Sequence, residues 1–210
     1  MKNNILEVIK RLKKAYPDAK VSLSHSNALE MLVATILSAQ CTDARINIVT
    51  KVLFKKYRKV EDYAKAGLKE FEADIHSTGF YRNKAKNIIA SAKLIIKNFG
   101  GKVPDTMEEI LNLPGVARKT ANVVLGAAYG IVEGIVVDTH VIRLSQRLGF
   151  SKNDNQEKIE KDLMQIVPKN DWFLFSHLIQ AHGRKICKAR NPDCPGCFLN
   201  NICPKINVNL

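Results

Sequence analysis

Apolar residues recur at helical spacing along almost the whole of this 210-residue sequence. Over residues 4–16, for example, Ile5, Val8, Leu12 and Tyr16 fall on one face, which predicts an amphipathic helix packed on a core. The same spacing, bounded by turn or cap residues, predicts further helices over 27–38, 42–57, 61–65, 68–76, 81–98, 106–112, 117–129, 138–148, 155–167 and 171–187. No alternating pattern persists long enough to predict a strand. We therefore expect an all-α fold.

The chain contains no internal repeat or linker that would divide it into separate domains. With 46% hydrophobic residues, it can bury a sizeable core in one globule or in two closely packed lobes. We expect two helical lobes. Residues 22–132 would form one continuous lobe, and residues 1–21 would join residues 133–210 in the other.

A tight turn joins two of the expected helices in the segment EEILNLPGVARKTANVV, residues 108–124. Gly115 would let the backbone turn tightly, and N–H groups at the start of the next helix can bind phosphate oxygens. The segment of about 106–129 is thus predicted to be a helix-hairpin-helix that holds DNA without reading its sequence. An ordinary helix corner is the alternative. The expected DNA-contacting residues of the hairpin are Leu113, Gly115, Ala117 and Arg118.

Lys119 and Asp138 are candidate catalytic residues, because both are expected near the N-termini of helices. An amine attacks carbon only when it is deprotonated, and we expect the positive helix end, Arg118 and partial burial to favour that form of Lys119. The Asp138 carboxylate could stabilise positive charge that develops on a sugar, and could accept a proton. The alternatives are a solvated surface lysine and a simple helix cap.

An excess of basic residues favours a polyanionic partner. The 33 Lys and Arg residues against 20 Asp and Glu give a formal net charge of +13. A nucleic acid fits this charge, although a solvated basic surface is the alternative. The N-terminal sequence lacks the features of a secretory signal, and the longest apolar run, 31–37, is too short to span a bilayer. We expect no membrane partner and an intracellular location, such as the cytoplasm or nucleoid of a prokaryote or another DNA-containing compartment.

Four cysteines near the C-terminus form the pattern C-x6-C-x2-C-x5-C, comprising Cys187, Cys194, Cys197 and Cys203. Disulfides are disfavoured, because an intracellular protein is kept reduced. Four single thiolates around one loop suit a 4Fe-4S iron–sulfur cluster, whereas a structural zinc ion usually takes two short cysteine pairs; both stay open. Either metal would order a short cationic loop that has no core of its own.

Five segments together point to a known family. They are LSAQCTD, TGFYRNKAKNI, LPGVARKTANVVL, VDTHV and the four-cysteine tail, and they extend over nearly the whole chain. In order and spacing they are similar to the endonuclease III family, within the helix-hairpin-helix DNA glycosylase superfamily. The resemblance implies a bifunctional DNA glycosylase and apurinic/apyrimidinic (AP) lyase with a 4Fe-4S cluster. Such an enzyme removes oxidised or otherwise damaged pyrimidines from duplex DNA. We expect a monomer, because one chain is enough to bend DNA around a single lesion.

The resemblance also implies roles for individual residues. Lys119 would attack C1′ of a flipped nucleotide and displace the base, leaving an imine whose β-elimination breaks the strand on the 3′ side. Asp138 would assist base departure and proton transfer. Family loops at the positions of Gln40 and Phe80 insert into DNA, so these side chains would fill the gap in the duplex. The alternatives for these two are a polar loop residue and a core aromatic.

Three features depart from the commonest family pattern. Ala117 stands where the hairpin often has a second glycine, so a positive φ there would be strained. Cys41 replaces a frequent threonine, and the loop 130–134 is slightly longer than usual. We expect Cys41 to be a small buried residue or a pocket neighbour, and His140 to pack or hydrogen-bond within the pocket rather than bind metal.

Other interpretations keep the fold but change the chemistry. A monofunctional mismatch or damaged-base glycosylase of the same superfamily is one alternative, because pocket specificity rests on a few residues. An adenine-specific mismatch glycosylase fits less well, since that relative lacks the lysine nucleophile and usually carries a further C-terminal domain. A non-catalytic, redox-sensing DNA-binding protein is a third, against which the joint presence of Lys119 and Asp138 argues.

Overall fold

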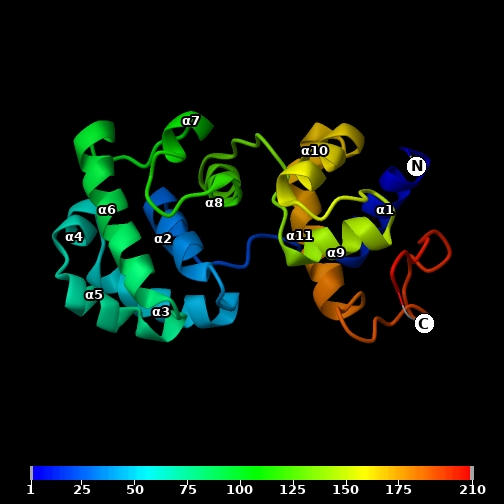
Figure 1. Ribbon diagram of the computed structural model, residues 1–210, viewed down its shortest axis with the longest axis horizontal. Helices are drawn as coiled ribbons and strands as arrows, with labels where there is room; N and C mark the ends of the chain where they lie inside the picture. Colours follow the sequence, from blue (N-terminus) through cyan, green and yellow to red (C-terminus); the bar gives the residue numbers. More distant parts are fainter. Residues whose placement is uncertain (1, 209–210) are drawn as a thin grey trace. The chain divides into compact units, whose positions relative to one another are not determined.

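The computed structural model describes residues 2–208, and every regular element in that range is helical (Figure 1). The α-helices are α1 (Lys2–Ala15), α2 (Ala28–Ser38), α3 (Asp43–Lys56), α4 (Val60–Lys65), α5 (Leu68–Asp74), α6 (Tyr81–Phe99), α7 (Met107–Ile110), α8 (Arg118–Val124), α9 (Thr139–Arg147), α10 (Gln156–Ile166) and α11 (Trp172–Lys185). Short 3-10 helices lie at His76–Thr78 and Lys169–Asp171. The expected all-α class is confirmed. Over the same residues, no helix is both long and apolar enough to cross a membrane.

The described chain divides into two compact units. The central unit runs from Val21 to Glu133, and the terminal unit combines the chain up to Lys20 with the chain from Gly134 onward. Each unit has its own buried apolar core. The first helix, α1, and the last, α11, therefore belong to the same unit.

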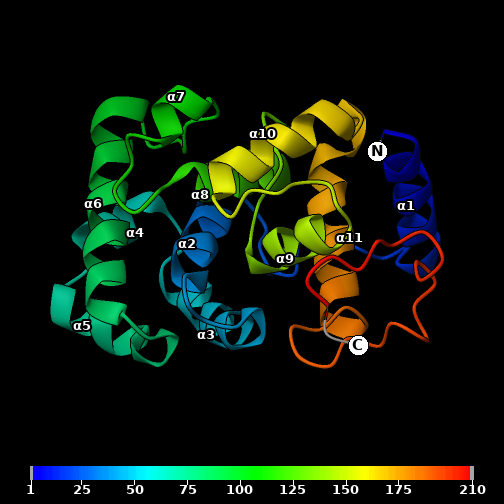
Figure 2. The ribbon, with the colours of Figure 1, turned by 45° about the vertical axis from the view of Figure 1, so that its right-hand side comes forward.

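In the central unit, the 19-residue helix α6 packs against α2, α4 and α5 (Figure 2). Ile88 and Ile95 of α6 join Leu32 and Ile36 of α2 in the core. The helix ends at Gly100, whose left-handed backbone (φ 59°) lets its N–H donate to the Ile95 carbonyl. One face of α6 is therefore buried in the core of the unit.

The helix-hairpin-helix consists of α7, α8 and the turn between them. Thr106 caps α7 by accepting a hydrogen bond from the N–H of Glu109 at 3.3 Å. In the turn, Leu113 and Val116 are 2% and 8% exposed, and the N–H of Val116 donates to the Leu113 carbonyl. Two apolar side chains thus anchor the hairpin to the core, while Gly115 between them stays exposed.

The terminal unit packs α11 against α1 and α9. Leu12 of α1, Leu144 of α9 and Phe175 of α11 are fully buried in one core. After α11 the described chain forms turns but no further helix. Within the described part of this segment, one apolar side chain is fully buried, that of Leu199 at 1% exposure. The order of the segment must therefore come largely from interactions other than a core of its own.

The helix ends agree with the sequence except where a different local structure takes over. The helix expected over 68–76 ends at Asp74 and is followed by a 3-10 turn. The helix expected over 117–129 is α8 followed by a π-helical stretch, Leu125–Tyr129, which stops at Gly130. Apolar periodicity reports which residues are buried, and α, 3-10 and π geometries bury nearly the same ones.

Candidate active site and cysteine loop

Lys119 is the second residue of α8, and its side chain is exposed. The helix begins directly after the hairpin turn, so the amine extends from the same part of the central unit as Gly115. The expected partial burial of Lys119 is not found. An exposed amine is open to a large ligand such as a polymer, which a closed small-molecule pocket would exclude.

Asp138 belongs to the terminal unit and is the N-cap residue of α9. Its Oδ1 accepts hydrogen bonds from the N–H groups of His140 and Val141, both at 2.9 Å. These bonds satisfy two of the N–H groups that the start of a helix leaves unpaired. Because both bonds end on Oδ1, the cap fixes the orientation of the carboxylate without using Oδ2.

His140 is held by Arg143 one turn further along α9. Arg143 Nη2 donates to His140 Nδ1 and to the carbonyls of Gly183 and Cys187, each at 3.1 Å. Arginine has no acceptor, so Nδ1 is the accepting nitrogen of the imidazole. A side chain at Gly183 would come within 2.7 Å of His140 Nδ1 and 2.9 Å of Arg143 Nη2. Glycine on α11 therefore makes room for this arrangement.

The hairpin residues expected to contact DNA differ in exposure. Gly115 and Ala117 are exposed and Arg118 is half-buried, but Leu113 lies in the core. The Leu113 side chain anchors the turn, and the expected contact of this residue with DNA stays a prediction. Ala117 has φ −95°, so this position needs no glycine and alanine is unstrained.

Gly115 is constrained by both its backbone and its surroundings. Its φ is +79°, and a Cβ there would lie 2.8 Å from Nδ2 and 2.9 Å from Cβ of Asn87 on α6. One turn further along α6, the hydroxyl of Ser91 donates to the Pro114 carbonyl at 2.8 Å. Helix α6 therefore contacts two consecutive residues of the hairpin turn, Pro114 and Gly115.

Gln40 and Phe80 are exposed residues with left-handed backbone, at φ 54° and 48°. Phe80 is 64% exposed, so the alternative of a core aromatic is excluded. The ring of the next residue, Tyr81, lies 4.5 Å from the ring of His76, measured between centroids. The Arg82 guanidinium lies 5.0 Å from the centroid of the Tyr81 ring. An exposed aromatic next to a cation suits contact with nucleic acid bases.

Lys84 was not expected to matter, yet it links the segments next to Gln40 and Phe80. It is 5% exposed, and its Nζ donates to the carbonyls of Leu37 and Thr78, both at 2.8 Å. Cys41, half-buried at the edge of the core, lies near this amine. The sequence did contain a signal, because Lys84 falls on the apolar face of α6 together with Ile88.

All four C-terminal cysteines line one cavity of the terminal unit. Each is a free, half-buried thiol, and apolar side chains including Leu144 and Leu199 line the same cavity. Among the described residues, no three metal-binding side chains are grouped closely enough to hold one ion.

Arg147 holds the beginning of the cysteine loop, Cys187–Cys203. Although charged, it is 8% exposed, and its Nη1 donates to Cys187 Sγ at 3.3 Å and to the Lys188 carbonyl at 2.7 Å. Its Nη2 donates to the Ala189 carbonyl at 3.1 Å. A buried cation beside a sulfur would offset the negative charge of metal-bound thiolates.

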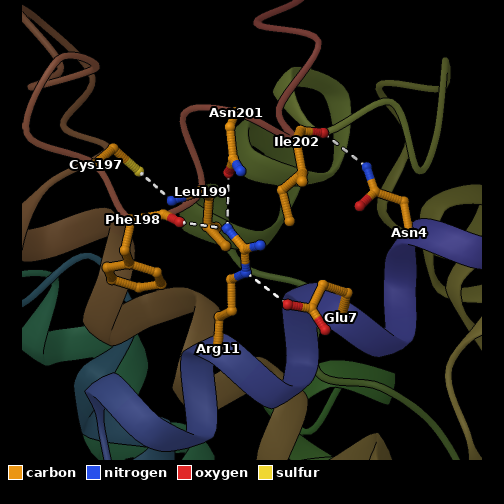
Figure 3. A network of polar contacts seen from close by, with 8 residues as sticks. All are labelled: Asn4, Glu7, Arg11, Cys197, Phe198, Leu199, Asn201 and Ile202. Atoms are coloured by element: carbon orange, nitrogen blue, oxygen red, sulfur yellow. Dashed lines mark hydrogen bonds and ion pairs between the residues drawn. The ribbon is translucent and has the colours of Figure 1, made fainter.

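Helix α1 holds the other end of the loop (Figure 3). Arg11 Nη1 donates to the Phe198 carbonyl at 2.8 Å and to Asn201 Oδ1 at 2.7 Å, while its Nε pairs with Glu7. Asn4 Nδ2 donates to the Ile202 carbonyl at 2.7 Å. Polar side chains from α1 and α9 thus fix both ends of a loop that has little core.

Comparison with known proteins identifies the family. The model of the HhH-GPD superfamily base excision DNA repair proteins matches residues 33–169. Endonuclease III of Synechocystis sp. is 53% identical over 208 residues, which cover 99% of this chain and 95% of that protein. The Bacillus subtilis endonuclease III is 51% identical over 90% of this chain and 86% of that protein. The chain belongs to the endonuclease III family.

A solved endonuclease III structure extends the similarity to three dimensions. It is a trapped endonuclease III–DNA covalent intermediate described as an estranged-adenine complex, and it is 47% identical to this chain with a TM-score of 0.93. The match covers 98% of this chain and 96% of that one. This member of the endonuclease III family is therefore a base excision repair enzyme, a DNA glycosylase and AP lyase.

Proposed function

We propose that this endonuclease III family enzyme removes damaged pyrimidines from duplex DNA and that Lys119 is its nucleophile. The observation that carries the proposal is the exposed amine of Lys119 on the first turn of α8, directly after the hairpin. A nucleotide must leave the base stack before an enzyme can reach its C1′. An amine beside a DNA-binding turn can meet such a nucleotide without a deep pocket of its own.

The proposed reaction proceeds through a Schiff base. The neutral amine of Lys119 attacks C1′, the bond from C1′ to the base breaks, and the base leaves with a proton. Loss of the amine proton and opening of the sugar give an imine between Nζ and C1′. Removal of a proton from C2′ then breaks the C3′–O bond, so the strand is cut on the 3′ side of the abasic site. Hydrolysis of the imine frees the lysine.

Asp138 is the proposed partner of this lysine. Its carboxylate would stabilise positive charge on the sugar as the base departs, and would accept the proton that Lys119 loses. The N-cap supports this role, because two hydrogen bonds to Oδ1 hold the carboxylate in one orientation. We place His140 and Cys41 at the edge of the pocket that receives the flipped nucleotide.

Gln40 and Phe80 are the proposed wedge that fills the space left by the flipped nucleotide. Unstacking a base costs a few kcal/mol, and an inserted side chain recovers part of this cost. Phe80 is apolar yet 64% exposed, which favours such a role over packing. The hairpin would hold the phosphate backbone through Arg118 and the exposed backbone at Gly115 and Ala117.

We further propose that Cys187, Cys194, Cys197 and Cys203 hold a 4Fe-4S cluster. Four half-buried thiols around one cavity fit such a group, and their single spacing around one loop differs from the two short cysteine pairs that a zinc ion usually takes. When bound, the cluster would supply metal–sulfur bonds that cross-link the loop. Arg147 would then donate to one ligand sulfur. The iron and sulfide content of the purified protein tests this assignment.

In this proposal the enzyme acts as a monomer on double-stranded DNA, in the compartment that holds the DNA. The two functional lobes would be residues 22–132, with the hairpin and the nucleophile, and residues 1–21 with 133–210, carrying Asp138 and the cluster.

Borohydride trapping on a duplex with a single thymine glycol tests the nucleophile. Reduction of the imine should give a covalent protein–DNA adduct with the wild type and with Lys93→Gln, an exposed lysine of α6. Lys119→Gln should give no adduct and no strand cleavage, yet bind the duplex with similar affinity. An adduct with Lys119→Gln would refute the assignment. Base release by the wild type without any adduct would instead indicate a monofunctional glycosylase.

A further inference from the structure

The Lys84 ammonium group is buried between two segments that are far apart in the sequence. One of its acceptors, the Leu37 carbonyl, belongs to the last turn of α2, where carbonyls have no partner within the helix. The other, the Thr78 carbonyl, ends the 3-10 turn before α6. One amine thus satisfies the carbonyls at the ends of two elements.

The two carbonyls lie just before the two exposed side chains described above. Gln40 follows Leu37 by three residues, and Phe80 follows Thr78 by two. Both residues have left-handed backbone, which a non-glycine residue keeps only when its surroundings hold it there. The hydrogen bonds of Lys84 are contacts that both segments share.

We propose that Lys84 is a positioning residue that joins the Gln40 and Phe80 loops into one wedge, so that the two side chains enter DNA together. The inference rests on the proposed function, because it assumes that Gln40 and Phe80 insert into DNA as proposed above. Lys84 itself does not touch DNA in this role, since its amine points into the central unit.

Other lysines of α6 do not share this environment. Lys86, Lys93 and Lys97 are exposed, as expected for residues that interact with solvent or with phosphates. Burial lowers the pKa of Lys84 below its ordinary value, an effect that the neighbouring Cys41 opposes. A buried amine with two backbone acceptors holds structure rather than attracting a polyanion over a distance.

Hydrogen exchange tests the support directly. Lys84→Met removes the donors but keeps a side chain of similar length, and Lys93→Met is the matched control on the exposed face of α6. Lys84→Met should speed exchange of the N–H groups of Cys41 and Gly79, which bond to carbonyls within their own loops. Lys93→Met should not. A folded Lys84→Met protein with unchanged exchange at both loops would overturn the proposal.

The wild type supplies a second test that does not depend on a variant that folds. If one amine joins both loops, they should open together, and the protection factors at Cys41 and Gly79 should agree within about tenfold. Protection that differs by more than this would mean that the loops open independently, which would also overturn the proposal.

A fluorescent base analogue opposite the lesion tests the link to function. Lys84→Met should weaken the fluorescence change on binding and slow single-turnover excision on the order of tenfold or more, because a small misplacement of positioning groups costs rate. In a Phe80→Ala background the same change should add little, since the wedge is already lost. A fully additive effect would indicate a general loss of stability and contradict the proposal. Failure of wild-type trapping, with the exchange results intact, would refute the proposed chemistry alone.

Discussion

Asp138 is both the N-cap residue of α9 and the proposed catalytic carboxylate. As the N-cap of α9 it accepts two N–H hydrogen bonds on Oδ1, and an asparagine carbonyl oxygen could accept the same bonds without a charge. The sequence alone could not separate a cap from a catalytic carboxylate, because both place an aspartate directly before a helix. The structure establishes the cap, and the proposed catalytic role can be separated from it by substitution.

We expect Asp138→Asn to retain nearly wild-type stability but to slow base excision by about 10²–10⁴-fold, the range typical of general acid–base groups. Asp138→Ala should lose the same activity and also about 1 kcal/mol of stability, because the cap is gone. Denaturant unfolding and single-turnover excision measure the two effects. Equal stability of the two variants would show that the cap contributes nothing, and wild-type activity of Asp138→Asn would remove the carboxylate from the mechanism.

At the scale of elements, α6 organises the exposed parts of the central unit. Its first residue follows Phe80, Lys84 bonds to both wedge loops, and Asn87 and Ser91 contact the hairpin. These residues recur along one side of the helix, so a single rigid element supports three loops. Loops that bind a ligand need such support, because they have little core of their own.

The hairpin's dependence on α6 predicts the effect of a methyl group at Gly115. Gly115→Ala should cost about 1–3 kcal/mol for the positive φ, and more for the contact with Asn87, and should weaken binding to undamaged duplex DNA. Gly130→Ala is the control, since its φ is also positive (+69°) but a Cβ there meets nothing within 4 Å. Denaturant unfolding and fluorescence anisotropy measure both. Equal losses for the two variants would show that Asn87 imposes no constraint.

Much of this element structure was predictable because helices and caps are local. The stripe of residues on α6 and the cap of α9 depend on neighbours within a few positions. The roles of Lys84, Arg147 and Arg11 were not predictable, since each bonds to carbonyls 47, 41 and 187 residues away, respectively. The burial of the Leu113 side chain was not predictable either, because the pattern of a turn does not reveal which side faces the core.

At the scale of the whole molecule, basic side chains can contact DNA phosphates at fixed positions only where the fold orders the segments that carry them. The cysteine loop presents Lys188 and Arg190 as exposed cations, and Leu199 is its one fully buried apolar side chain within the described chain. Arg11 and Arg147 hold its ends, but the middle depends on what the four thiols bind. A metal cluster would therefore control whether these two cations act at fixed positions.

The salt dependence of DNA binding tests this control. If Lys188 and Arg190 each contact one phosphate, removing the metal by oxidation and chelation should reduce the slope of log K against log[salt] by about 1.8. The double variant Lys188→Ala/Arg190→Ala, with the metal retained, should show the same reduction and lose no helix by circular dichroism. Unchanged slopes in both proteins would show that the loop does not contact DNA. A reduced slope only in the metal-free protein would mean that the cluster acts on other cations, such as Lys185 at the end of α11.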